Sequence, residues 1–95
     1  MLGPYVIVRT YSAGVHAGHL ASRDGKEVVL ANTRRLWYWD GAASLSQMAI
    51  SGVTAPANCK FSVTVPQNTL TEAIEILVCT QAAEANIKGV PEWKR

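Results

Sequence analysis

The stretch that decides the fold runs from Val15 to Ala31 and reads VHAGHLASRDGKEVVLA. Both of its halves are rich in apolar residues, and Arg23-Asp24-Gly25-Lys26 stands between them. An Asp-Gly pair readily takes the positive φ angles of a tight hairpin turn. We therefore expect an antiparallel hairpin of strands 15–22 and 27–31.

Further strands are expected on both sides of this hairpin. Residues 5–11, YVIVRTY, are β-branched and aromatic, and Pro4 stands at their start, where a strand tolerates proline. Residues 34–39, RRLWYW, follow a break at Asn32-Thr33 and form another candidate. Residues 60–65 alternate, with Phe61, Val63 and Val65 facing inward, until Pro66 ends the run.

Two short helices are indicated by their capping residues. Ser44-Leu45-Ser46-Gln47 has the pattern of a capping box, and Gly52 suits the position just past a helix end. We expect a helix over residues 45–51. Thr80 can cap a second helix over residues 81–88, which Gly89 and Pro91 would end.

The segment from Thr69 to Thr80 is ambiguous. Thr69 and Glu72 have capping-box spacing, and apolar residues recur at helical spacing after them. However, Ile74, Ile76 and Val78 alternate and are β-branched, which favours a strand. We choose a strand over residues 73–79.

These elements predict one domain over residues 1–95 with an α+β fold. The sheet would be antiparallel, with about five or six strands, and the two short helices would pack on one of its faces. A sheet covered on one face leaves the other face for solvent, a ligand or a second copy of the chain.

Composition limits the function classes. The chain has 95 residues, of which 48% are hydrophobic and only 17% charged, against about 25% charged in typical soluble domains. This sparse charge predicts a homo-oligomer, because exposed apolar surface usually marks an interface. The net charge of +2 is too small for a duplex nucleic-acid module, but a mild positive bias would suit a small anion.

The sequence also indicates a compartment. No segment approaches 18 consecutive apolar residues, so no membrane span is expected, and the residues 1–4 show no secretory signal. We expect a cytoplasmic protein. In a reducing cytoplasm Cys59 and Cys79 would be free thiols.

The sequence shows few residue patterns that would indicate a metal site or a catalytic site. His16 and His19 would face opposite sides of a strand, and Cys59 and Cys79 are isolated from one another. Neither histidine has an acidic neighbour in sequence, and no glycine-rich phosphate loop is present. We expect no metal, no cofactor and no enzymatic activity.

Residues 9–14 and residues 34–39 together hold the parts of a nucleotide pocket. Arginine forks bind phosphate, a small-residue turn lets backbone amides approach an anion, and aromatic faces stack on bases. We assign phosphate contacts to Arg9, Arg34 and Arg35, base stacking to Tyr11, Trp37 or Trp39, and the lining of the turn to Ser12, Gly14 and His16. The alternative is that the aromatics form core or an oligomer interface and that the arginines rim the sheet.

Four motifs carry a resemblance. They are Tyr11 to His16 with Gly18, Arg34 to Trp39, Ser44 to Gln47, and the closing Val90-Pro91-Glu92-Trp93. With them the chain resembles a family of small, mostly uncharacterised proteins of tailed bacteriophages and prophages. The resemblance implies a role against host defence, and one class of such proteins sequesters nucleotide immune messengers without cleaving them.

Two functional hypotheses follow, and a minor enzyme acting on a nucleotide ranks third. The first is a phage protein that sequesters a phosphate-bearing messenger, of the cyclic oligonucleotide or cyclic ADP-ribose type, in the cytoplasm of the infected bacterial cell. The second is a phage protein that inhibits a host defence protein by direct contact. Trp93 is expected to anchor the tail 92–95.

Overall fold

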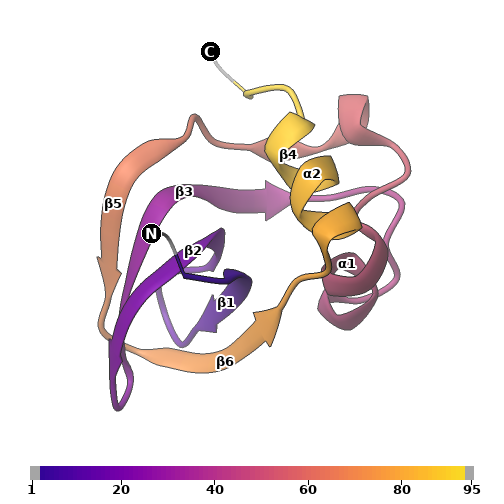
Figure 1. Ribbon diagram of the computed structural model, residues 1–95. Coiled ribbons are helices and arrows are strands. Elements are labelled where there is room, and N and C mark those ends of the chain that lie inside the picture. Colours follow the sequence, from indigo (N-terminus) through magenta and orange to yellow (C-terminus); the bar gives the residue numbers. More distant parts are fainter. Residues whose placement is uncertain (1–2, 94–95) are drawn as a thin grey trace.

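The computed structural model describes residues 3–93 of the chain (Figure 1). The predicted tail therefore lies partly outside the described residues, as does the start of the N-terminal segment. In chain order the elements are β1 (Tyr5–Thr10), β2 (Val15–Asp24), β3 (Glu27–Tyr38), α1 (Leu45–Ser51), a 3-10 turn (Pro56–Asn58), β4 (Lys60–Phe61), β5 (Val65–Leu70), β6 (Ala73–Val78) and α2 (Gln81–Gly89). The α+β fold is as expected from the sequence.

The strands form one antiparallel sheet in the order β4-β3-β2-β1-β6, and β5 pairs with the first part of β3. Only Thr71-Glu72 separates β5 from β6, so this connection carries the sheet from β3 round to β1. Figure 1 shows β5 and β6 curving round the strands β1 to β3, with both helices on the opposite side. The sheet is therefore curled, with an inner face that lies away from the helices.

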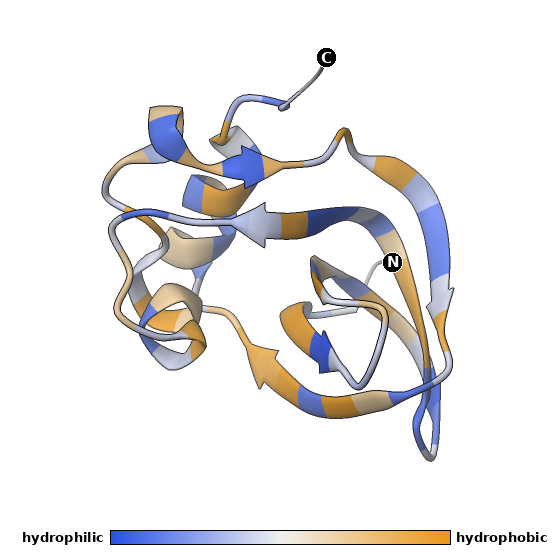
Figure 2. Cartoon of the chain, turned by 180° about the vertical axis from the view of Figure 1, so that it is seen from behind, coloured by the Kyte–Doolittle hydropathy of each residue, from blue (hydrophilic) through white to orange (hydrophobic). Residues whose placement is uncertain are grey.

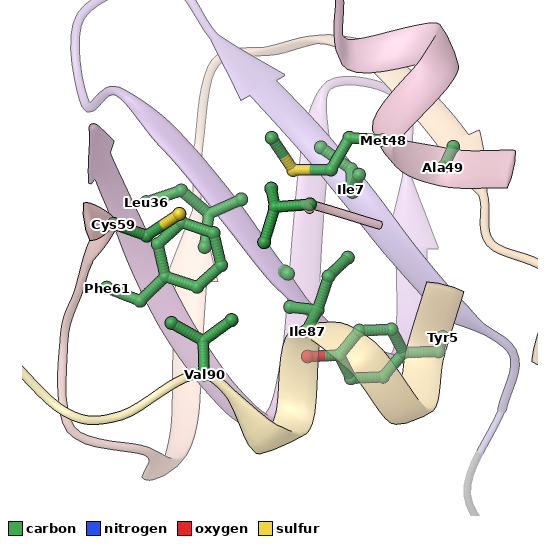
Figure 3. Packing of buried hydrophobic residues seen from close by; sticks show 11 residues of the cluster. Tyr5, Ile7, Leu36, Met48, Ala49, Cys59, Phe61, Ile87 and Val90 are labelled. Atoms are coloured by element: carbon green, nitrogen blue, oxygen red, sulfur yellow. The ribbon is translucent and has the colours of Figure 1, made fainter. Parts of the chain in front are cut away.

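Two apolar clusters pack on the two faces of the sheet. The larger one lies between the sheet and the helices, and Figure 3 shows side chains from β1, β3, α1 and α2 converging there. It contains Tyr5, Ile7, Ala17, Leu36, Met48, Ala49, Val53, Cys59, Phe61, Ile87 and Val90. The smaller cluster fills the inner face of the curled sheet with Val6, Val8, Val28, Leu30 and Leu70.

The helix predictions are confirmed to the residue or nearly so. The Ser44 hydroxyl accepts the N–H of Gln47 at 3.1 Å, and the Gly52 N–H donates to the Met48 carbonyl at 2.8 Å. Thr80 caps α2 by accepting the Ala83 N–H at 3.1 Å. The ambiguous segment is a strand, β6, as chosen from its β-branched alternation.

Two strand predictions are corrected. The expected break at Asn32-Thr33 is a β-bulge inside the single strand β3, with Asn32 at a φ of 47°. The expected strand 60–65 ends after Phe61, and Val63 and Val65 are exposed rather than inward. The chain resumes as β5, where proline is tolerated because only one edge of this strand is paired.

Gly18 of β2 lies directly against the bulge. A Cβ at this position would come within 2.6 Å of the Thr33 Cβ and 2.8 Å of its hydroxyl oxygen. The Thr33 hydroxyl donates to the Ala17 carbonyl at 2.8 Å, so its side chain is fixed. Only glycine therefore allows β2 and β3 to approach each other here.

Neither helix of the described chain has the length and apolar character that a membrane crossing requires.

Candidate functional site

Some of the predicted site residues line one hollow in the surface, with a volume of about 170 Å³. It is formed by β2, the last part of β3, the segment after β4, and β5. We call this hollow the Arg35 pocket; its lining residues are His16, Thr33, Arg34, Arg35, Trp37, Ser62, Val65 and Asn68.

The bulge at Asn32 determines which arginine can present its side chain here. Before the bulge, Val28 and Leu30 pack on the inner face of the sheet. One extra residue shifts the alternation, so Thr33 and Arg35 take that face and Arg34 takes the helix-covered face. Without the bulge the two arginines would exchange faces.

Arg35 has a fixed backbone and a side chain available for a ligand. Its N–H donates to the Ser62 hydroxyl at 2.7 Å, and the Ser62 N–H donates to the Arg35 carbonyl at 2.8 Å. The side chain is exposed, and within residues 3–93 it has no ion-pair partner. Because no acidic residue lines the pocket, its donors can bind an anion.

His16 lies opposite Arg35 in the strand register and is buried. Its Nε2 contacts the Ala13 carbonyl at 2.9 Å, and a carbonyl can only accept, so Nε2 carries the proton. Burial lowers the pKa of His16 below its usual value and the nearby Arg35 lowers it further, although the hydrogen bond to Ala13 raises it. The imidazole is therefore neutral at pH 7.

Two tryptophan side chains lie at and beside the pocket. Trp37 is 52% exposed, and its ring meets Trp93 edge-to-face at 5.3 Å between centroids. The Lys60 ammonium lies 5.3 Å from the Trp93 ring centre. Trp93 is held by its N–H, which donates to the Phe61 carbonyl at 2.9 Å, so it anchors the described part of the tail as expected.

Arg34 does not fit the predicted phosphate contact. It is buried, and its Nη1 donates to the carbonyls of Ile87 and Val90 at 2.9 and 2.8 Å. Its Nε donates to the Ser62 carbonyl at 2.9 Å. The Ile87 and Val90 carbonyls lie at and just beyond the C-terminal end of α2, where a cation is favoured by the helix dipole. The side chain of Arg34 thus joins α2 to the sheet.

The turn after β1 is also occupied by internal contacts. The Ser12 hydroxyl donates to the Glu72 carboxylate at 2.6 Å, and the Ala13 N–H donates to the Thr10 hydroxyl at 2.9 Å. Gly14 has a φ of 86°, which serves the turn itself. A carboxylate beside Ser12 disfavours a phosphate, contrary to the predicted role of this turn.

Arg9, Tyr11 and Trp39 lie away from the pocket. Arg9 pairs with Glu75 of β6, with 3.5 Å between Nε and Oε1. Tyr11 is 78% exposed in the turn. Trp39 was predicted with Trp37 as a base-stacking residue, but β3 ends at Tyr38 and Trp39 packs against the helix-covered cluster. The partly buried Trp39 therefore packs at the margin of this cluster and not in the pocket.

The pocket is also lined by four residues that were not predicted from the sequence: Thr33, Ser62, Val65 and Asn68. Asn68 and Val65 enter the pocket because β5 pairs with β3, and residues 66–70 were not expected to form a strand. Alternation in residues 65–70 is weak, so no pattern in this segment indicated the pairing. Ser62 was placed inside a strand that the structure ends one residue earlier.

The two histidines diverge as predicted. His16 lines the pocket, whereas the His19 Nδ1 contacts the Gly3 carbonyl at 2.9 Å on the other face. Within residues 3–93 no three residues of the types His, Cys, Asp and Glu gather as metal ligands would.

A family model for a domain of unknown function, DUF6948, matches residues 3–87, which include the Arg35 pocket but not Trp93. The chain belongs to this family. No curated protein and no solved structure matches it. The DUF6948 match thus places the pocket within the family domain and assigns it no ligand.

Proposed function

We propose that this DUF6948 protein binds a phosphate-bearing nucleotide in the Arg35 pocket and sequesters it without cleavage. The observation that carries the proposal is the Arg35 guanidinium, which has no ion-pair partner in the described chain and lies in a pocket without carboxylates. Its fork suits two hydrogen bonds to a phosphate, and the Trp37 ring two residues on can stack on a base.

The size of the pocket suggests how such a ligand would lie. Pockets for whole small molecules usually measure about 300–1,000 Å³, whereas this one holds about 170 Å³. We infer that the phosphate enters the pocket, near Arg35 and the amide of Asn68, while the base lies outside on Trp37. A messenger with several phosphates would then be held through one nucleotide unit.

Binding without cleavage is supported by the residues that line the pocket. No carboxylate lies among them to act as a general base. The resemblance to tailed-phage proteins supplies the biological setting. In that setting the ligand is a nucleotide immune messenger, and the protein acts in the cytoplasm of the infected cell.

The test is thermal melting with cyclic di- and trinucleotides and cyclic ADP-ribose isomers. At 100 times Kd a ligand stabilises by about 2.7 kcal/mol, which raises Tm by roughly 10–20 °C for a domain of this size. Arg35→Ala removes charge-assisted hydrogen bonds and should weaken binding by about 10- to 150-fold. Arg23→Ala is the matched control, because Arg23 lies at the tip of the β2–β3 hairpin.

Two results would count against the proposal. One is no Tm shift of the wild-type protein with any of these ligands at millimolar concentration. The other is an altered nucleotide recovered after heat denaturation, which would indicate an enzyme. If the Arg35→Ala variant keeps the ligand-induced Tm shift, the protein binds the nucleotide at a site other than the Arg35 pocket.

A second candidate is inhibition of a host defence protein by direct contact. It is favoured by the exposed side chains of Trp37, Tyr38 and Trp93 beside two cationic residues, Arg35 and Lys60. Exposed Trp, Tyr and Arg are the residue types that dominate binding energy at protein interfaces. A pulldown from host lysate that yields one stoichiometric protein, and loses it with Trp37→Ala, would favour this function.

A further inference from the structure

The free edge of β6 is a second surface of the molecule, distinct from the Arg35 pocket. Within the described sheet β6 pairs with β1 alone, and no strand lies on its other side. Figure 2 shows β6 as a largely hydrophobic ribbon at the outside of the fold. An edge of this kind is a template for another strand.

The backbone of β6 has hydrogen-bonding groups that point away from β1. The Cys79 N–H donates to the Tyr5 carbonyl at 2.9 Å, at the end of the β1–β6 ladder. Hydrogen-bonded pairs alternate along an antiparallel ladder, so Leu77 is bonded to β1. The N–H and C=O groups of Ile76 and Val78 consequently face outward along the free edge.

The edge is open from Ile74 to Val78. It lies between the β2–β3 turn, where the Ala73 N–H donates to the Lys26 carbonyl at 3.0 Å, and α1, where the Thr80 N–H donates to the Ala49 carbonyl at 2.9 Å. Ile74 is 51% and Val78 67% exposed, and the only charge from Ala73 to Val78 is Glu75. Arg9 of the neighbouring strand pairs with that carboxylate, with 3.5 Å between Nε and Oε1. Natural edge strands usually carry a lysine, a proline or a covering loop, and the span from Ile74 to Val78 has neither a lysine nor a proline.

We propose that a second copy of this chain pairs antiparallel with β6 about a two-fold axis at Ile76. In this register Ile76 lies opposite the partner's Ile76, and Ile74 lies opposite the partner's Val78. If the partner strand shifts by two residues, Glu75 lies opposite the partner's Glu75. The repulsion of these like charges disfavours that register. The Ile76 register avoids this contact and uses the outward backbone groups of Ile76 and Val78.

A second copy suits this edge because the strand is self-complementary. Each exposed branched side chain covers its counterpart, and the sheet continues from β1 through β6 into the partner. Ile50 of α1, 63% exposed, extends the apolar surface, since its carbonyl accepts the Thr80 hydroxyl just beyond β6. Closed two-fold dimers bury the same patch on both copies.

The test is sedimentation equilibrium of the full chain, with hydrogen exchange on the same sample. We expect a dimer at micromolar concentration, with the Ile76 and Val78 amides protected in a concentration-dependent manner. Val78→Lys should raise the dimer dissociation constant by at least about 100-fold, because a valine contact is lost on each side and two ammonium groups enter the interface. Val63→Lys, at an exposed position outside β6, is the control and should leave the constant unchanged.

A wild-type monomer at 100 µM overturns the proposal, as does a dimer that Val78→Lys leaves intact. Both variants change exposed residues, so circular dichroism should show native structure in each. A monomer whose β6 amides become protected only on addition of host protein would assign this edge to a foreign strand and reject the dimer.

Discussion

At the scale of single residues, neighbours in sequence have opposite roles. Arg34 and Arg35 carry the same charged group, yet one is buried against the carbonyls at the end of α2 and the other is exposed at the pocket. Trp37 and Trp39 divide in the same way between the surface and the margin of the helix-covered cluster. Substitutions at these pairs should therefore separate stability from binding.

Arg34→Ala should lower the free energy of unfolding by about 3 kcal/mol or more, because it leaves the Val90 carbonyl without a donor and the Ile87 carbonyl with only the Val90 N–H at 3.3 Å. Arg35→Ala should stay within about 0.5 kcal/mol of wild type. Urea unfolding of the two variants measures both. Equal losses would show that Arg34 does not hold α2.

Trp39→Ala should destabilise more than Trp37→Ala, because only Trp39 packs against the helix-covered cluster. Complete burial of a large aromatic makes its truncation cost about 3–5 kcal/mol, and the partial burial of Trp39 reduces this to about 2 kcal/mol. Trp37→Ala should instead reduce ligand-induced stabilisation. Thermal melting with and without ligand distinguishes them, and the reverse order would place Trp37 in the core.

Cys79 should react slowly as a thiol in the native protein. Burial raises the pKa of Cys79 from 9.0 to about 11. At pH 8 the native thiolate fraction is then about 100-fold below that of the unfolded chain, since two pKa units separate the states. Mass spectrometry of a timed alkylation, with and without urea, measures the ratio. Native alkylation at the unfolded rate, or a Cys59–Cys79 disulfide, would contradict this.

At the scale of secondary-structure elements, the close contact between β2 and the bulge in β3 constrains the sheet. The bulge places Arg35 on the pocket face, and it depends on the absence of a side chain at Gly18. The Thr33 side chain cannot move aside easily, because its hydroxyl donates a hydrogen bond to the Ala17 carbonyl. A small change in β2 should thus affect both stability and the pocket.

Gly18→Ala should cost about 1–3 kcal/mol, the usual cost of overpacking, because its Cβ would lie 2.6 Å from the Thr33 Cβ. Gly89→Ala at the end of α2 is the matched control, with no atom within 4 Å of the new Cβ. There alanine should be neutral or stabilise by up to about 1 kcal/mol. Urea unfolding compares them, and a tolerated Gly18→Ala would show that the strands can separate at the bulge.

At the scale of the whole molecule, stability should depend on pH through groups that the fold keeps neutral. Burial raises the pKa values of Tyr5 and Cys79 above 10.0 and 9.0, their ordinary values. Burial also lowers the pKa of His16 below 6.5. Each group therefore favours the folded state over a limited range of pH.

The free energy of unfolding should change with pH in opposite directions on the acid and the alkaline side of neutrality. Above about pH 9 the unfolded chain loses protons that the folded chain keeps, so the free energy of unfolding should fall as pH rises. Below about pH 6.5 the unfolded chain gains a proton at His16 that the folded chain resists, so stability should also fall as pH decreases. Urea unfolding from pH 5 to 10.5 measures both limbs. Tyr5→Phe and Cys79→Ala should flatten the alkaline limb, and an unchanged slope would contradict this origin.

The sequence by itself determined the features that depend on neighbours a few residues apart. Ser44 and Thr80 cap their helices through amides three residues on, and the turn at Gly25 closes the hairpin. The alternation of Ile74, Ile76 and Val78 correctly indicated a strand. Such signals are local, because the hydrogen bonds and side-chain periods that define them lie within one or two turns of chain.

Only the tertiary structure decided which residues share the pocket. The Arg34 side chain donates to the Ile87 carbonyl, although 53 positions of sequence separate the two residues. Similarly, β5 lines the pocket because it pairs with β3. The bulge then assigned the two arginines to opposite faces. A one-residue shift in strand register exchanges inside and outside, and its position is set by packing between β2 and β3 rather than by the residues of either strand alone.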